Sequence, residues 1–155
     1  MIKKTFYLCL LILLAFVASC NDPDCIKVGG DRIRMNFYDL ETGEASLIRI
    51  NNLQVLGADS ILFAGVPDVT TLILPINPVA DSITAYFDTE LGNDTLIIAY
   101  SRIARLISEE CGAEAVFSGI NIIRSDFDSI RVINSSAAIN FLEPDIVNEN
   151  IQVFN

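Results

Sequence analysis

Short runs of β-branched and aromatic residues, each bounded by Gly, Pro, Asn or Asp, limit this 155-residue chain to a fold built from strands. The clearest run is residues 32–38, in which Ile33, Met35 and Phe37 alternate with Arg, Asn and Tyr. Because successive side chains of a strand point to opposite faces, this segment has one apolar face and one mostly polar face. The pattern therefore predicts a strand that is half buried against a core.

Ten further segments share this character, and no stretch of ten residues has a convincing helical period of 3.6. The segment nearest to a helix, 101–110, is expected to be a strand that leads into a turn. Many short strands with frequent turns predict an all-β fold, namely a single β-sandwich of about 8–10 strands, immunoglobulin-like or related. A turn at 41–44 is expected to connect strand 32–38 to a second strand at 45–50. The other expected strands are 53–56, 61–63, 71–76, 83–87, 95–100, 104–107, 115–123, 129–133 and 151–154.

The N-terminus has a different pattern, because Lys3 and Lys4 precede 13 consecutive apolar residues at positions 6–18. A bilayer span needs about 20 residues, so this run predicts a secretory signal peptide; a buried N-terminal helix and a membrane anchor are the alternatives. Residues 17–20 (Val-Ala-Ser-Cys) resemble the lipobox of bacterial lipoproteins, in which the Cys thiol receives the lipid. We therefore expect cleavage before Cys20 and membrane attachment through acyl chains such as palmitate on that residue.

These features divide the chain into three parts. Residues 1–19 are the expected signal peptide, 20–28 the lipidated N-terminus with a short tether, and 29–155 the β-sandwich domain. Loss of Lys3 and Lys4 with the signal changes the net charge from −10 to −12, and such an acidic chain lacks the basic face that nucleic acid requires. The predicted location is the cell envelope, with the outer membrane favoured and its periplasmic and surface faces both left open.

Once the signal peptide has left and Cys20 carries lipid, two of the four Cys remain, Cys25 and Cys111. An isolated pair in the oxidising envelope is usually bridged, so we expect a disulfide between them. A reactive thiol at Cys111 is the alternative, and the carboxylates of Glu109 and Glu110 would suppress its thiolate. Cys25 lies five residues after Cys20, so the tether would reach at most about 17 Å and hold the domain near the headgroups.

The chain has no His, which removes His-based metal sites, Ser-His-Asp triads and imidazole acid–base catalysis. An Asp-Ser-Ile phrase recurs at 59–61, 81–83 and 128–130, with Asp-Thr-Leu at 94–96 as a relative, and each copy precedes an expected strand. We interpret the copies as turns in which Asp or Ser satisfies backbone N–H groups. Calcium binding is the alternative, but it needs several oxygen ligands in one loop. We expect no metal and no cofactor.

Two pairs of nearby carboxylates would support glycoside hydrolysis if folding placed such acids across a cleft. These pairs are Glu109 with Glu110 and Asp126 with Asp128. We expect solvated turns at both places, because closeness in sequence does not create an active-site geometry. The processed chain has no Trp and three Tyr, at positions 38, 86 and 100, which give little support for a sugar-stacking platform.

Four further motifs accompany the lipobox and Cys25. They are Leu-Pro-Ile-Asn-Pro at 74–78, Asn-Asp-Thr-Leu at 93–96 followed by Tyr100, Ser-Glu-Glu-Cys-Gly at 108–112, and Asn-Ile-Gln-Val-Phe at 150–154. Together they resemble a family of small, uncharacterised lipoproteins of Bacteroidetes-type bacteria, defined by a domain of unknown function. The resemblance extends from Cys25 to the C-terminus and implies an envelope lipoprotein, with no activity, ligand or catalytic residue to carry over.

The expected function is a non-enzymatic binding or accessory module, lipid-anchored in the envelope, whose partners are the membrane and other envelope proteins. The basis is the absence of His and of any convergent catalytic set in the sequence. Two alternatives stay open. A small-ligand or glycan carrier needs a well-formed pocket, and a carboxylate-dependent hydrolase needs two acids facing each other across a cleft. The sequence does not assign the ligand-binding residues.

Overall fold

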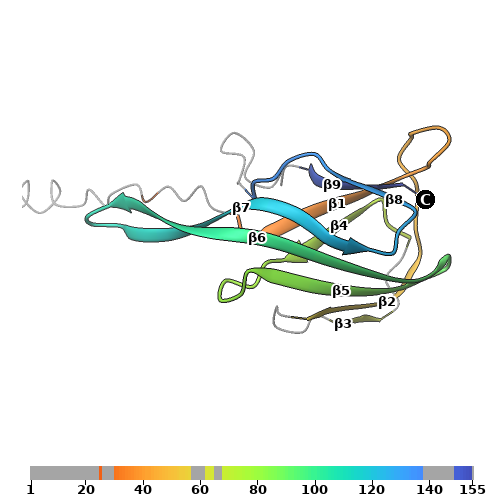
Figure 1. Ribbon diagram of the computed structural model, residues 1–155, viewed down its shortest axis with the longest axis horizontal. Coiled ribbons are helices and arrows are strands. Elements are labelled where there is room, and N and C mark those ends of the chain that lie inside the picture. The colour runs from red at the N-terminus through yellow and green to blue at the C-terminus, as the bar shows by residue number, and fades with distance from the viewer. Residues whose placement is uncertain (1–24, 26–29, 57–61, 65–67, 138–148, 155) are drawn as a thin grey trace, which may run out of the picture.

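The computed structural model describes residues 25, 30–56, 62–64, 68–137 and 149–154. Within these ranges every regular element is a β-strand, and no helix long and apolar enough to cross a membrane occurs there (Figure 1). The predicted signal peptide and Cys20 lie outside the described residues. The strands are β1 (Arg32–Tyr38), β2 (Ile50–Leu56), β3 (Leu62–Ala64), β4 (Thr71–Pro75), β5 (Ser82–Thr89), β6 (Gly92–Ser108), β7 (Gly112–Ser125), β8 (Ser129–Val132) and β9 (Glu149–Phe154).

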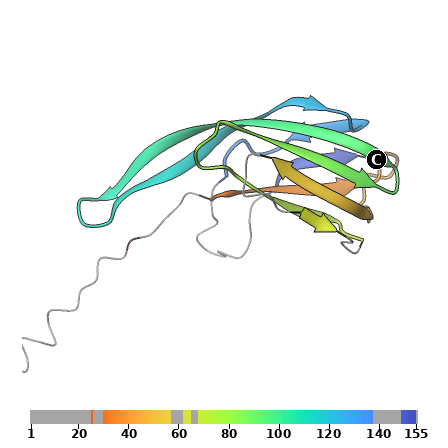
Figure 2. The same ribbon diagram turned by 90° about the horizontal axis from the view of Figure 1, so that it is seen from below.

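The strands form two sheets that pack against each other, which confirms the predicted all-β sandwich (Figures 1 and 2). The first sheet has the order β4-β1-β9-β8 and the second the order β3-β2-β5-β6-β7. Strand β1 pairs in parallel with β9, so the first and last described strands lie side by side, and the other pairs are antiparallel. These orders differ from the ABED and CFG sheets of immunoglobulin constant domains, so the strand order of that fold is not observed here.

The core lies between the sheets and follows the alternation seen in the sequence. Ile33, Met35 and Phe37 of β1 are fully buried. In the other sheet, every second residue of β5 is buried from Ile83 on, as is every second residue of β6 between Leu96 and Tyr100. Each such side chain contributes roughly 1.5–3 kcal/mol when removed from water. The buried apolar residues form one cluster that includes Leu53, Val55, Leu74, Ile83, Phe87, Leu96, Ile98, Tyr100, Phe117, Ile120, Ile151 and Val153.

Strand β1 has the bounds expected from the sequence, most other strands differ from the expected bounds by one to three residues, and two differences are larger. The expected strands 95–100 and 104–107 are one strand of 17 residues, β6, and its partner β7 has 14 residues. The expectation of short strands was therefore wrong for this pair. Most of the expected strand 45–50 is also absent, because Ala45 and Ile48 make only isolated bridges and β2 begins at Ile50. The expected turn at 41–44 is present, and Asp39 accepts hydrogen bonds from the backbone of Glu41 and Thr42.

The long β6–β7 pair continues past the sandwich as a two-stranded arm, residues 101–118, which projects at one end of the molecule (Figures 1 and 2). A β-bulge marks its base, because Gly119 and Ile120 lie opposite Tyr100 alone. Gly119 has a φ of +65°, a conformation that side-chain-bearing residues rarely adopt, and bulges of this kind bend the strand. Beyond the bulge Ile103 and Leu106 are 58% and 65% exposed, so the arm lies outside the core except at its base, where Phe117 is buried.

The turn of the arm is joined to the N-terminal segment by a disulfide between Cys25 and Cys111, the pair favoured by the cysteine count. Their Cα atoms are 5.5 Å apart, and the two residues are separated by 86 positions in sequence. In the turn itself Ser108 Oγ accepts a hydrogen bond of 2.9 Å from the Cys111 N–H, and Gly112 has a φ of +73°. Cys25 is therefore attached to the turn of the arm, whereas Gly30 and Asp31, just before β1, are hydrogen-bonded to Ala137 and Ile76 of the sandwich.

Tyr100 connects the Leu-Pro-Ile-Asn-Pro segment to the base of the arm. Its hydroxyl accepts a hydrogen bond from the Asn77 N–H at 3.1 Å and donates one to the Asn77 carbonyl at 3.0 Å. Its ring packs edge-on against Phe117 at 5.7 Å between centroids. Burial raises the pKa of the Tyr100 hydroxyl, which keeps it protonated and able to donate at neutral pH.

Buried Asn150 fixes the parallel pairing of β1 with β9. The pairing is irregular between Arg34 and Met35, where Asn150 is the extra residue of β9. Its Oδ1 accepts a hydrogen bond from the Arg34 N–H at 3.0 Å, and its Nδ2 donates to the carbonyls of Asn134 and Ser136 at 3.0 and 2.9 Å. The side chain thus replaces the backbone partners that the irregularity removes.

We expect Asn150→Ala to lower the free energy of unfolding by about 2–4 kcal/mol, because each buried backbone group left without a partner costs roughly 1–3 kcal/mol. Urea unfolding measures the change. Asn121→Ala is the matched control, since Asn121 is exposed on β7 and its loss should change stability by no more than about 0.5 kcal/mol. Equal effects of the two substitutions would contradict the structural role of Asn150.

Candidate functional site

The candidate site is a shallow depression of about 370 Å³ on the outward face of the second sheet. Six outward residues from three adjacent strands line it, and we call them the polar face. The pairing register arranges them in two cross-strand rows. One row is Gln54, Tyr86 and Thr95, and the other is Asn52, Asp88 and Asn93.

The same alternation that builds the core turns these side chains outward. Leu53 and Val55 enter the core, so Asn52 and Gln54 point to the opposite face of β2. Strand β5 repeats this arrangement, because Ala85 and Phe87 are buried while Tyr86 and Asp88 are exposed. A bulge in β2 also brings Asn51 opposite Asp88, and the Asn51 Nδ2 donates to Asp88 Oδ1 at 3.3 Å.

The groups of the polar face are available for binding. The Tyr86 side chain is 43% exposed, which leaves the ring accessible. Within the described part of the chain, the amide groups of Asn52, Gln54 and Asn93 make no hydrogen bond to another protein group. An amide offers both donors and acceptors, and a carboxylate offers acceptors. The face can therefore hold a ligand by several hydrogen bonds beside one aromatic surface.

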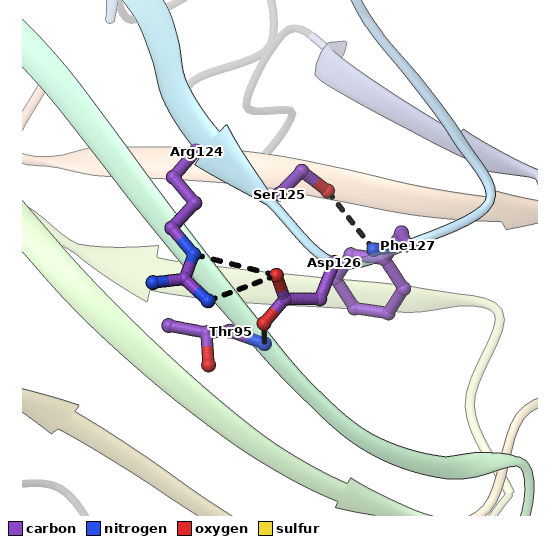
Figure 3. A network of polar contacts seen from close by, with 5 residues as sticks. All are labelled: Thr95, Arg124, Ser125, Asp126 and Phe127. Carbon is purple, nitrogen blue, oxygen red and sulfur yellow. Dashed lines mark hydrogen bonds and ion pairs between the residues drawn. The ribbon is translucent and has the colours of Figure 1, made fainter.

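Thr95, one of the residues that line the depression, is held by a structural clamp formed by Asp126 (Figure 3). The Asp126 Oδ2 accepts a hydrogen bond from the Thr95 N–H at 3.2 Å, and the Asp126 N–H donates to the Thr95 carbonyl at 3.0 Å. The Arg124 guanidinium donates to Oδ1 at 3.3 Å. Hydrogen bonding from Thr95 and the adjacent Arg124 lower the pKa of Asp126. Both of its oxygens are engaged in joining β6 to the end of β7.

The pKa of Asp94, near the start of β6, is shifted in the opposite direction from that of Asp126. Partial burial raises the pKa of the Asp94 carboxyl, and the negative charges of Asp126 and Asp128 raise it further. Opposite shifts of two acids occur in acid–base enzymes. Here, however, Asp126 is occupied by its clamp, and the sequence pair Asp126 and Asp128 lies in the exposed turn before β8. The other pair, Glu109 and Glu110, is exposed at the tip of the arm, far along β6.

Two of the Asp-Ser-Ile copies precede a strand where the structure describes them, but no backbone N–H donates to their Asp or Ser side chains there, so the predicted role of these side chains is not observed. Asp81 immediately precedes β5, and Asp128 immediately precedes β8, as predicted. Asp94 differs from the prediction, because it lies inside β6 and not in a turn before it. The copy at 59–61 falls outside the described residues. In the ranges that the structure describes, no group of three or more Cys, Asp or Glu side chains is placed to hold a metal ion.

Sequence reasoning did not identify the polar face. It gave Tyr86 little weight as a platform, because the neighbours of a strand residue lie across the sheet and not beside it in sequence. Asn52 and Gln54 come from a strand more than 30 positions away from Tyr86. The alternation in β2, β5 and β6 was visible, but only the pairing of the three strands collects their outward residues.

Fold and site together define the class of protein: a two-sheet β-sandwich with an extended hairpin arm and an open polar face on one sheet. The chain belongs to a family of unknown function, DUF6452, which matches residues 48–154. The matched range includes the polar face, the arm and Cys111, while β1 and Cys25 precede it. No curated protein and no solved structure matches the chain. The lipoprotein character expected from the resemblance stays a prediction.

We expect Asp94→Asn to raise the Tm at pH 7 by on the order of 1–3 °C. The raised pKa of Asp94 means that folding favours its protonated form, so its contribution to stability is present below the unfolded pKa and is lost as pH rises through the folded pKa. The difference between variant and parent should therefore vanish near pH 3. Thermal melts from pH 3 to 8 measure this, with exposed Asp81→Asn as control. A pH-independent difference would contradict the electrostatic cause.

Proposed function

We propose that the chain is a cell-envelope lipoprotein, anchored through Cys20, and that its sandwich is a non-enzymatic binding module. The observation that carries the binding role is the polar face, on which three amides, a carboxylate and an exposed ring come together from three strands. The lipobox at 17–20 supports the anchor. Binding requires only these surface groups, whereas catalysis would require acids that are free to exchange protons.

The disulfide determines how such an anchor would hold the domain. Cys25 is bonded to Cys111 in the turn of the arm, and five residues reach at most about 17 Å from Cys20 to Cys25. The part of the domain nearest the bilayer would then be the tip of the arm. From Ser101 to Ser108 the arm extends roughly 25 Å at about 3.3 Å per residue. The sandwich would thus stand away from the headgroups, which modifies the simpler expectation that the whole domain lies close to them.

The negative net charge also supports an arrangement in which the sandwich stands away from the lipid headgroups. After removal of the signal peptide the chain would have a net charge of −12, and Glu109 and Glu110 are exposed at the tip. An acidic surface is repelled by anionic lipid, so the acyl chains alone would hold the protein at the membrane. The polar face lies near the other end of β6, roughly 40 Å from Ser108 along the strand. It would face the aqueous compartment.

The two alternative functions receive less support from the geometry. A carrier encloses most of its ligand in an apolar pocket, whereas this depression is open, lies on a sheet face and has mainly polar residues around it. A carboxylate-dependent hydrolase needs two acids on opposite sides of a substrate, and the Asp126 carboxylate is bound to Thr95 and Arg124. A binding module needs neither feature.

We expect Cys20→Ala to abolish acylation and release the protein from the membrane, since the thiol of Cys20 would carry the lipid. Metabolic labelling with an alkyne analogue of palmitate, followed by fractionation, measures both effects, and globomycin should block processing of the parent. Cys9→Ala is the matched control and should behave as the parent does. A Cys20→Ala protein that stays labelled and membrane-bound would contradict the anchor.

The binding role predicts that the polar face contacts another envelope component in cells. A photo-crosslinking amino acid at position 86 should capture such a component, protein or glycan. The same group at Ile73 is the control, because Ile73 is similarly exposed but lies on β4 of the other sheet. Equal capture from both positions, or capture from neither, would contradict the assignment of the polar face as the binding surface.

A further inference from the structure

We propose that the polar face binds a neutral glycan through one to two sugar rings. This inference rests on the proposed binding function and names the ligand class for the same site. It follows from the spacing of the two rows, from the chemistry of their side chains, and from the charge around them.

The spacing matches the size of a sugar unit. Adjacent strands are about 4.8 Å apart, so a row across β2, β5 and β6 spans roughly 10 Å, and the two rows are separated by about 7 Å along the strands. These dimensions suit one or two pyranose rings lying flat on the sheet. The depression is open, so a longer polymer can continue past it on either side.

The side chains match the chemistry of hydroxyl groups. Each sugar hydroxyl both donates and accepts, and the amides of Asn52, Gln54 and Asn93 do the same. Asp88 adds acceptors and is oriented by the amide of Asn51 at 3.3 Å. In the centre of the other row the exposed Tyr86 ring offers an apolar surface to the C–H face of a sugar. Amides beside one aromatic ring suit an uncharged, hydroxyl-rich ligand better than an apolar one.

The charges around the depression select against anionic ligands. Asp88 and Asp94 line it, the charges of Asp126 and Asp128 act on Asp94, and the cation Arg124 pairs with Asp126. Uronic acids, phosphates and anionic lipid headgroups would meet this negative field. A cationic peptide would also match this charge, and its backbone N–H and C=O groups would match the amides, so capture of a protein and not of a glycan at position 86 is the outcome that would favour it. A neutral glycan uses every group of the face.

The test uses the full chain purified in detergent and measures its affinity for defined oligosaccharides. The probes are neutral oligomers of glucose, mannose, galactose and N-acetylglucosamine, with oligogalacturonate as the acidic comparison. We expect at least one neutral oligomer to bind and oligogalacturonate to bind at least tenfold more weakly.

Variants show whether the polar face is responsible. Tyr86→Ala should weaken binding about tenfold, whereas Tyr86→Phe keeps the ring and should stay within about twofold of the parent. Asn52→Ala should weaken binding about fivefold, and Asn121→Ala, on the same sheet but outside the depression, should leave it unchanged. Unchanged Tm values confirm that each variant is folded.

Three results would overturn the inference: no binding of any neutral oligomer, equal or tighter binding of oligogalacturonate, or neutral binding that survives both Tyr86→Ala and Asn52→Ala. A failure of the glycan inference can be distinguished from a failure of the proposed binding function. If position 86 crosslinks to a protein in cells while no glycan binds in detergent, the glycan inference is wrong and the binding module stands.

Discussion

The register of the β3-β2-β5-β6-β7 sheet is the constraint on which both the core and the candidate site depend. In each of the three central strands, alternate residues enter the core, and Leu53, Phe87 and Leu96 are buried there. The residues between them form the polar face on the other side of the same backbone. A slip of one residue would place Tyr86 in the core and Phe87 in water. Burial of the apolar side chains therefore positions the polar ones, and the site needs no loop or separate element to hold its geometry.

A second constraint determines where this sheet ends. The bulge at Gly119 separates the part of β6 and β7 that covers the core from the part that leaves it as the arm. Isolated two-stranded ribbons are marginally stable, so the arm depends on its continuity with the sheet and on the disulfide at its turn. An ion pair of 3.2 Å between Arg105 and the buried side chain of Glu114 adds a cross-strand contact midway along it. The arm is thus tied at its base by the sheet and at its tip by Cys111.

Local pattern was enough to predict the fold class and most strands, because alternation and turn residues are properties of neighbouring positions. The bounds of β1 were predicted as observed, and the Cys25–Cys111 pair followed from a count of cysteines and the redox state of the envelope. Non-local pairing explains what was missed. Residues 101–106 are all exposed, and their strand conformation comes from pairing with β7. Tyr86 likewise becomes part of a candidate site only because its strand pairs with β2 and β6. The sequence of positions 82–89 alone does not show this pairing.

In the proposed arrangement these two constraints would give the molecule two functional ends. Strand β6 contributes to both, since it begins at the polar face and ends beside the disulfide in the arm. In the proposed arrangement the tether after Cys20 is too short to carry an acidic domain away from an acidic bilayer, and the arm supplies the missing separation. A stiff ribbon also fixes orientation, which a flexible linker of the same reach would not do. With the arm directed toward the membrane, the polar face would lie at the far end of β6 and point sideways from the strand axis, so one continuous strand would set the distance between the anchor and the binding surface.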